Sequence, residues 1–206
     1  DQFKVGDKVK ALQSIHYPEN KASIIPARNR IAFEEFLKLQ IIVQYNKSRL
    51  QRNSKGLVIS VSEKTKNAFL KGLPFQLTYS QEKVLNEILS DLEKGKIMNR
   101  LIQGDVGSGK TVIAAAALIF IATAGYQSVM IAPTEILARQ HMKSLFNFLN
   151  NCANKSDIRI ALLVGSMKES EQIKIKQDLQ KGEIQILIGT HTVIQDDVVF
   201  HNLGLV

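Results

Sequence analysis

The sequence holds little cysteine, histidine or proline, and no long apolar run. Its one cysteine, Cys152, excludes an internal disulfide framework and any zinc site built from several cysteines. The four histidines are scattered, without metal-ligand spacing. The longest apolar stretch, Val112 to Ala124, is shorter than the roughly 20 residues that span a bilayer. The first residues begin no apolar run, so we expect no secretory leader, no membrane partner and a cytoplasmic compartment.

The excess of positive charge lies in the first third of an otherwise ordinary composition. Residues 1–72 hold 14 Lys or Arg against 6 Asp or Glu, whereas residues 73–206 hold 13 of each. The whole net charge of +8 therefore belongs to the first part, and between positions 47 and 71 the only acid is Glu63. A basic block beside a neutral globular part suggests a polyanion as partner, and the alternative is a solvated, mobile linker.

The first 72 residues show one clear helical pattern. Pro18 and Pro26 punctuate a poorly periodic start, and a helix is predicted from Ala27 to about Tyr45, with a wide apolar stripe that needs a packing partner. Residues 46–72 are polar and basic around one short strand-like run, 57–61.

After Pro74 short apolar strands alternate with helices. The strands are rich in Val, Ile and Leu with little alternation, as expected when both faces of a sheet are covered. This order predicts an α/β fold with a parallel sheet flanked by helices. The strand candidates are Arg100–Gln103, Ser128–Ala132, Ile158–Val164 and Ile184–Ile188, and the helices begin near Thr78, Lys110, Glu135 and Lys168.

A phosphate-binding loop lies between the first of these strands and its helix. The residues Gly104, Asp105, Val106, Gly107, Ser108, Gly109, Lys110 and Thr111 fit the pattern G-x-x-x-x-G-K-[ST]. Glycines let successive backbone N–H groups point at one anion, and the start of the helix adds unpaired donors. We expect Lys110 to reach the β- and γ-phosphates of ATP and the hydroxyl of Thr111 to bind Mg²⁺. The alternative is an ordinary glycine-rich turn.

The chain resembles the RecG family of superfamily-two DNA helicases, which remodel branched DNA. The resemblance rests on the run from Met98 to Thr111 and on four further segments. These segments are 132–141, 189–197 and the upstream pair 15–18 and 30–35. The transcription-repair coupling translocase shares the Gly-Asp-Val-Gly core, but Ser108 and residues 33–35 favour RecG. At Arg139 the chain departs from the family, which usually carries an acid there.

The resemblance implies further contact residues and a P-loop (RecA-like) fold. Gln81 and Phe75 match the family's adenine-reading segment, although Thr78 and Gln81 also form a capping-box pattern and Phe75 could be core. Residues matching segments that touch the DNA backbone are Pro133, Thr134, Gly165, Ser166, Thr190 and His191. For Thr134 and Ser166 a plain helix cap is the alternative, and for His191 a packed side chain.

By this resemblance the chain is a fragment of a monomeric bacterial, nucleoid-associated enzyme. Residues 1–26 would end the wedge domain, 27–72 would be a helical and basic linker, and 73–206 the first RecA-like lobe. A carboxylate pair that holds Mg²⁺ is expected after a further strand, which 202–206 would begin. We do not give that role to Asp196 and Asp197. The 206 residues alone are therefore expected to bind ATP weakly through the loop, without hydrolysing it at motor rates.

Two other classes of function stay open at this point. The chain could act as a nucleic-acid-binding module without catalysis, in which the basic block supplies most of the affinity. It could also be a P-loop ATPase that is no helicase, although segments 133–135 and 189–191 argue against this.

Overall fold

The computed structural model describes residues 6–53, 56–95, 97–151 and 158–206. Contacts divide the chain into two compact units, residues 1–54 and 55–206. Residues 55–72, which the sequence analysis assigned to the linker, therefore belong to the second unit. No helix in the described ranges is both long and apolar enough to cross a membrane.

The first unit consists of α1 (Lys8–His16) packed on the long helix α2 (Lys21–Asn53). The prediction that the helix starts at Ala27 was wrong, because Asn20 caps an earlier start. Its carboxamide oxygen accepts a hydrogen bond from the backbone N–H of Ser23 at 2.9 Å. Pro26 lies inside the helix, near its N-terminus, where a missing N–H costs one hydrogen bond without ending the helix.

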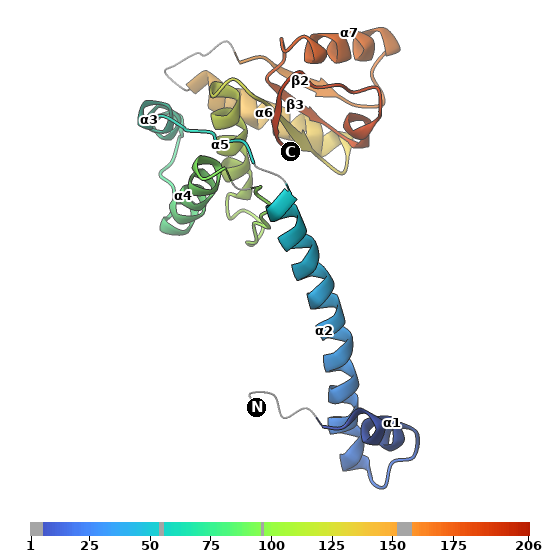
Figure 1. Ribbon diagram of the computed structural model, residues 1–206. Helices are drawn as coiled ribbons and strands as arrows, with labels where there is room; N and C mark the ends of the chain where they lie inside the picture. The colour runs from blue at the N-terminus through green and yellow to red at the C-terminus, as the bar shows by residue number, and fades with distance from the viewer. Residues whose placement is uncertain (1–5, 54–55, 96, 152–157) are drawn as a thin grey trace. The chain divides into compact units, whose positions relative to one another are not determined.

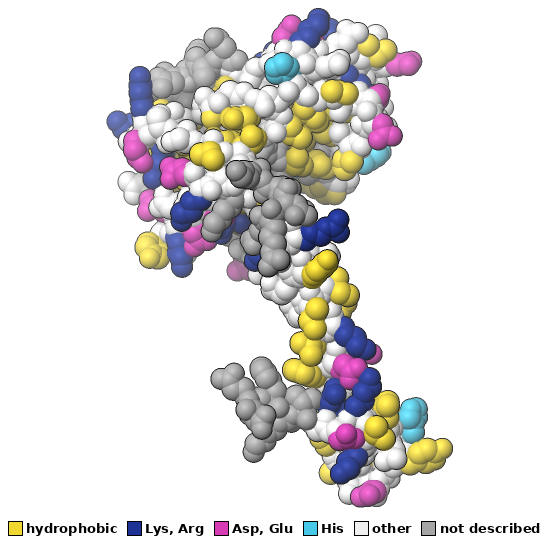
Figure 2. All heavy atoms as spheres, in the orientation of Figure 1, with side chains coloured by type: hydrophobic (Ala, Val, Ile, Leu, Met, Phe, Trp, Pro, Cys, Tyr) yellow, Lys and Arg dark blue, Asp and Glu magenta, His cyan; other side chains and the backbone are white. Residues whose placement is uncertain are grey.

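The apolar stripe of α2 is largely exposed in the part of the chain that the structure describes. Figure 2 shows apolar side chains running along α2. Phe36 is 68% exposed, and Leu39 and Val43 are more than half exposed. The packing that the sequence analysis expected for this stripe is therefore not provided by α1.

The second unit begins with two helices and continues as an alternation of helices and strands. Its elements are α3 (Glu63–Gly72), α4 (Tyr79–Glu93), α5 (Lys110–Thr123), β1 (Gln127–Ile131), α6 (Glu135–Asn151), β2 (Ile160–Leu163), α7 (Glu169–Gln180), β3 (Ile186–Gly189), the 3₁₀ turn η1 (His191–Ile194) and β4 (Leu203–Leu205). The predicted helices from Lys110 and Glu135 and the strand beginning near Asn202 are confirmed.

A four-stranded parallel sheet with the order β2-β3-β1-β4 forms the centre of this unit. Alternate residues of β3 face opposite ways: Ile186 and Ile188 join the core under α5 and α6, whereas Leu187 joins the cluster with Leu179 of α7. Helices α5 and α6 therefore cover one face of the sheet and α7 the other (Figure 1). The predicted parallel α/β fold is confirmed.

The basic segment after residue 55 is part of this core. Ile59 is 2% exposed, and its backbone N–H donates to the carbonyl of Leu92 at 3.0 Å, at the end of α4. The strand-like run 57–61 forms no strand. Phe69 of α3, an unpredicted helix, is 1% exposed and meets Phe120 and Phe148 edge to face. Residues 56–72 therefore pack as a structural part of the unit.

The prediction of a strand at Arg100–Gln103 was wrong. The segment pairs with none of the described strands, and a strand needs a neighbouring ladder to satisfy its backbone. Arg100 instead holds it to α4, where Asp91 and Glu87 accept its hydrogen bonds at 2.7 and 2.8 Å. Leu101 is 84% exposed. Of the expected strand, loop and helix, the structure therefore has the loop and the helix but not the preceding strand.

The buried side chain of Gln127 ties three elements together at the amino edge of the sheet. Its Nε2 donates to the carbonyls of Leu179 and Ile184 at 2.8 and 2.7 Å, and its Oε1 accepts from the N–H of Asn202 at 2.9 Å. A buried amide with all these partners fixes the ends of α7, β3 and β4 relative to β1.

Candidate functional site

The glycine loop 104–109 has a backbone that only glycine adopts easily. Gly107 and Gly109 have φ of +83° and +81°, in the left-handed region. A Cβ on Gly109 would also lie 2.3 Å from Nε2 of Gln81. Val106 at the tip is fully exposed. The loop is thus an open backbone surface that precedes α5 without a side-chain cap.

Lys110 folds back over this loop. Its Nζ donates to the carbonyls of Gly104 and Asp105 at 2.7 and 2.8 Å. An ammonium has three donors, so one is left for a ligand. The first turn of α5 contains no acid, and its unpaired N–H groups carry partial positive charge. Loop, ammonium and helix start together fit the phosphate chain of a nucleotide.

Thr111 stands next to Lys110 in the first turn of α5 and is partly buried. Its hydroxyl suits Mg²⁺, which prefers oxygen ligands and keeps several waters. Among the residues that the structure describes, no group of three or more His, Cys, Asp or Glu could hold a metal ion.

The side chain of Gln81 connects the start of α4 to the glycine loop. The capping box with Thr78 is present, and Oε1 of Gln81 accepts from the N–H of Thr78 at 2.8 Å. Its Nε2 also donates to the carbonyl of Ser108 at 2.8 Å. A carboxamide has two lone pairs and two N–H donors, so one of each remains. Gln81 can thus offer a donor and an acceptor to a base while it stays in the cap.

Phe75 lies on a loop and does not join the core. It is 47% exposed and lines a pocket of about 390 Å³. The other lining residues include Leu73, Pro74 and Glu82, and Glu82 follows Gln81 directly. The half-exposed ring is available to stack on a planar group.

The other predicted contact residues gather at one edge of the sheet. Pro133 and Thr134 follow the end of β1, Gly165 and Ser166 follow β2, and Thr190 and His191 follow β3. Because β2, β3 and β1 are adjacent and parallel, these three segments are neighbours at the carboxyl edge. A short turn joins the end of α5 to the start of β1, so the glycine loop at the other end of α5 points toward the same edge. Ligands of open α/β sheets bind at this edge.

The side chains at this edge are not equally accessible. His191 is exposed, whereas Thr190 is only 5% exposed and its hydroxyl lies 3.4 Å from that of Thr192. Thr134 caps α6 with a long hydrogen bond of 3.4 Å from the N–H of Leu137. The capping alternative for Thr134 is therefore realised, and the side chain of Thr190 is buried.

Sequence reasoning missed the contact that joins two of these segments. The hydroxyl of Ser166 donates to Oε1 of Glu135 at 2.5 Å, and the guanidinium of Arg139 donates to the same oxygen. Hydrogen bonds from Ser166 and then Arg139 lower the pKa of Glu135. The spacing of Glu135 and Arg139 by four residues on a helix is a signal for this ion pair, but no local pattern connects Glu135 to Ser166.

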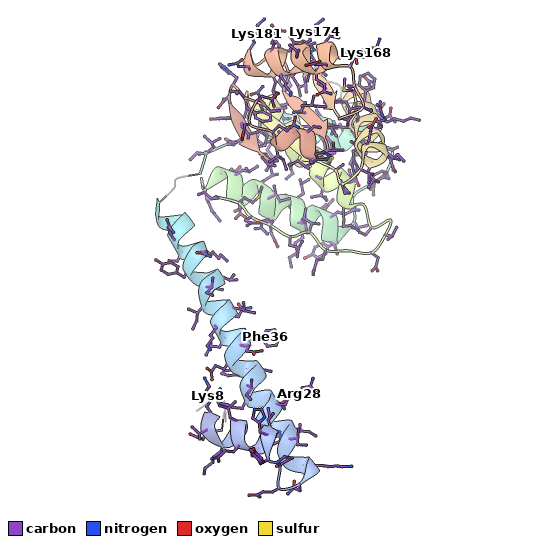
Figure 3. All side chains as sticks on the ribbon, turned by 90° about the vertical axis from the view of Figure 1, so that its right-hand side faces the viewer. Lys8, Arg28, Phe36, Lys168, Lys174 and Lys181 are labelled. Atoms are coloured by element: carbon purple, nitrogen blue, oxygen red, sulfur yellow. The ribbon has the colours of Figure 1, made fainter. Side chains whose placement is uncertain are left out.

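Helix α7, on the other face of the sheet, carries several charged side chains. Lys168, Lys174 and Lys181 stand in a row along the exposed side of α7 (Figure 3). Asp197 pairs with Lys176 of α7, and this hydrogen bond lowers the pKa of Asp197. Asp197 therefore has an ion-pair partner on α7.

Comparison with known proteins gives this site a family. A model of the DEAD/DEAH box helicases matches residues 78–206. The ATP-dependent DNA helicase RecG of Streptococcus pneumoniae serotype 4 is 43% identical over 206 residues, which is 100% of this chain and 30% of the relative. RecG of Bacillus subtilis is 42% identical over 99% of this chain and 29% of its own length. The chain thus spans about a third of the length of these relatives.

A solved structure agrees with the sequence comparison. A structure of RecG bound to a three-way DNA junction is 40% identical, with a TM-score of 0.81 over 95% of this chain and 26% of that one. This likeness supports the RecA-like assignment of the sheet and its helices. The chain therefore belongs to the DEAD/DEAH box helicase family, and over its whole length it is similar to the RecG helicases.

Proposed function

We propose that this chain is the ATP-binding part of an ATP-dependent DNA helicase or translocase that remodels branched DNA in repair and recombination. The observation that carries the proposal is the glycine loop, which points toward the carboxyl edge where three further contact segments meet. The whole-length similarity to RecG supports it. We further propose that the parent protein is a monomer of the bacterial cytoplasm that associates with the nucleoid.

In this proposal the loop binds the triphosphate, and the ammonium of Lys110 pairs with its negative charge. The backbone N–H groups around Gly107 and Gly109 bind phosphate oxygens, and Lys110 exchanges its loop carbonyls for the β- and γ-phosphates. Thr111 contributes its hydroxyl to Mg²⁺. When bound, ATP supplies the phosphoryl group whose hydrolysis drives movement along DNA.

Gln81 and Phe75 would hold the adenine. Replacing Gln81 with alanine removes both the capping box and the hydrogen bond to Ser108. We expect a loss of about 1 kcal/mol in stability from the cap, and an ATP affinity about tenfold lower with weaker preference over GTP. Calorimetric titration with ATP and GTP measures this. Thr78→Ala is the matched control, because it removes the cap from the N–H of Gln81 but leaves the bond to Ser108. Equal ATP affinities of the two variants would exclude a nucleotide role for Gln81.

The DNA part of the proposal predicts a steep salt dependence. If four basic residues of the block each neutralise a phosphate, log K falls by about 3.6 per unit of log salt. Changing Lys47 and Arg49 of α2 to glutamine should lower this slope by about 1.8, measured by fluorescence anisotropy with a labelled three-way junction. The control changes Lys21 and Arg28, exposed cations near the other end of the same helix. A flat response in the unchanged chain, with nucleotide binding retained, contradicts DNA binding through the block.

A further inference from the structure

Three hydrogen-bond donors converge on one carboxylate oxygen at the carboxyl edge. The Ser166 hydroxyl donates to Oε1 of Glu135 at 2.5 Å. Nε and Nη2 of Arg139 donate to the same oxygen at 3.1 and 2.7 Å. One hydroxyl and one guanidinium around a single anionic oxygen are also the donors that proteins use for a phosphodiester oxygen. The donors of this cluster therefore suit a phosphate group, and the carboxylate of Glu135 occupies the place that a phosphate oxygen would take.

The cluster is open to a ligand from outside. Ser166 is exposed, and the side chains of Glu135 and Arg139 are 33% and 55% exposed. Ion pairs at such exposed positions contribute little, because water and salt screen them. The lowered pKa of Glu135 means that the carboxylate is ionised at neutral pH and stands there as an anion. Nothing in this geometry buries the contact, so a backbone phosphate can replace it.

We propose that Glu135 is an internal competitor that occupies a phosphate position formed by Ser166 and Arg139, and that it leaves this position when the backbone of duplex DNA binds. The inference rests on the proposed function, because it needs DNA at the carboxyl edge. In this proposal Arg139 contacts the DNA backbone directly, and Glu135 lowers the affinity of the chain for DNA.

The test compares single substitutions in the 206-residue chain by anisotropy with a labelled duplex over a series of salt concentrations. Glu135→Gln should bind about threefold more tightly, because the amide competes less for the donors. Arg139→Ala should bind about fivefold more weakly and lose about 0.9 from the salt slope. Ser166→Ala should bind about threefold more weakly with an unchanged slope, since no charge is removed.

Two controls separate the position from its charge. Glu171→Gln removes an equal charge from the first turn of α7, and Lys143→Ala removes a cation one turn after Arg139 on α6. Glu171→Gln should change the affinity for duplex less than Glu135→Gln does. Lys143→Ala should likewise change it less than Arg139→Ala does. Unchanged or weaker binding of Glu135→Gln, or equal effects of Arg139→Ala and Lys143→Ala, would overturn the proposal. Failure of the unchanged chain to bind duplex also overturns it, while the nucleotide part of the proposed function is read separately by calorimetry. Thermal melting of each variant excludes unfolding as the cause.

Discussion

Replacing Lys110 with alanine should abolish most of the affinity of the chain for ATP. The ammonium is the one side-chain cation that contacts the glycine loop in the described residues. A hydrogen bond to a charged group contributes about 1.5–3 kcal/mol, which corresponds to about 10- to 150-fold in binding. Isothermal titration calorimetry with ATP and Mg²⁺ measures the change directly.

The fold should tolerate this substitution, so the effect can be assigned to binding. The carbonyls of Gly104 and Asp105 that lose their partner lie on exposed residues, where water can replace it. Lys174→Ala on α7 is the matched control, with the same loss of charge far along the chain. If both variants bind ATP like the unchanged chain, the glycine loop is no nucleotide site. Lys110→Arg should recover little, because a planar guanidinium does not replace a compact ammonium.

Replacing Phe69 with alanine should destabilise the second unit by about 3–5 kcal/mol. The ring is 1% exposed and packs against Phe120 of α5 at a centroid distance of 5.5 Å, so its loss leaves a cavity that the helices cannot fill. Unfolding by urea, followed by circular dichroism, measures the effect. The two units make more than one transition expected, so the transition that involves the second unit is the one to compare.

Phe36→Ala provides the matched control for this result. Phe36 is the same residue type on α2 but is 68% exposed, and its loss should change stability by less than about 0.5 kcal/mol. If residues 55–72 were a mobile linker, the two phenylalanines would behave alike. A similar small effect of both substitutions would therefore contradict the packing of α3 into the core.

The parts of the fold that could be predicted were those with a repeating local pattern. The helices from Lys110 and Glu135 follow from apolar spacing, and the strands near 128–132 and 184–188 follow from short runs of Val, Ile and Leu. Arg100–Gln103, in which only Leu101 and Ile102 are apolar, pairs with no strand of the described sheet. Composition reports that a segment is buried or extended, whereas a strand depends on a partner that is distant in sequence.

The same limit applies to the first unit and to the site. The sequence shows Pro26 but not the capping of Asn20 that lets a helix begin before it. The glycine loop was predictable because all its parts are consecutive. The contact of Ser166 with Glu135 joins residues 31 positions apart, and the contact of Gln81 with Ser108 joins residues 27 apart. Both exist only because the fold brings separate loops together.

The amide of Gln127 has a practical consequence for anyone who wishes to modify this protein. It fastens the end of the sheet opposite the ligand loops, with hydrogen bonds to Leu179, Ile184 and Asn202. Substitutions in the loops at the opposite edge are then expected to leave the sheet intact, except at glycines such as Gly109, where a Cβ would lie 2.3 Å from Nε2 of Gln81. A substitution at Gln127 instead leaves buried backbone groups without hydrogen-bond partners. We therefore expect a poor yield of folded protein rather than a defect in ligand binding.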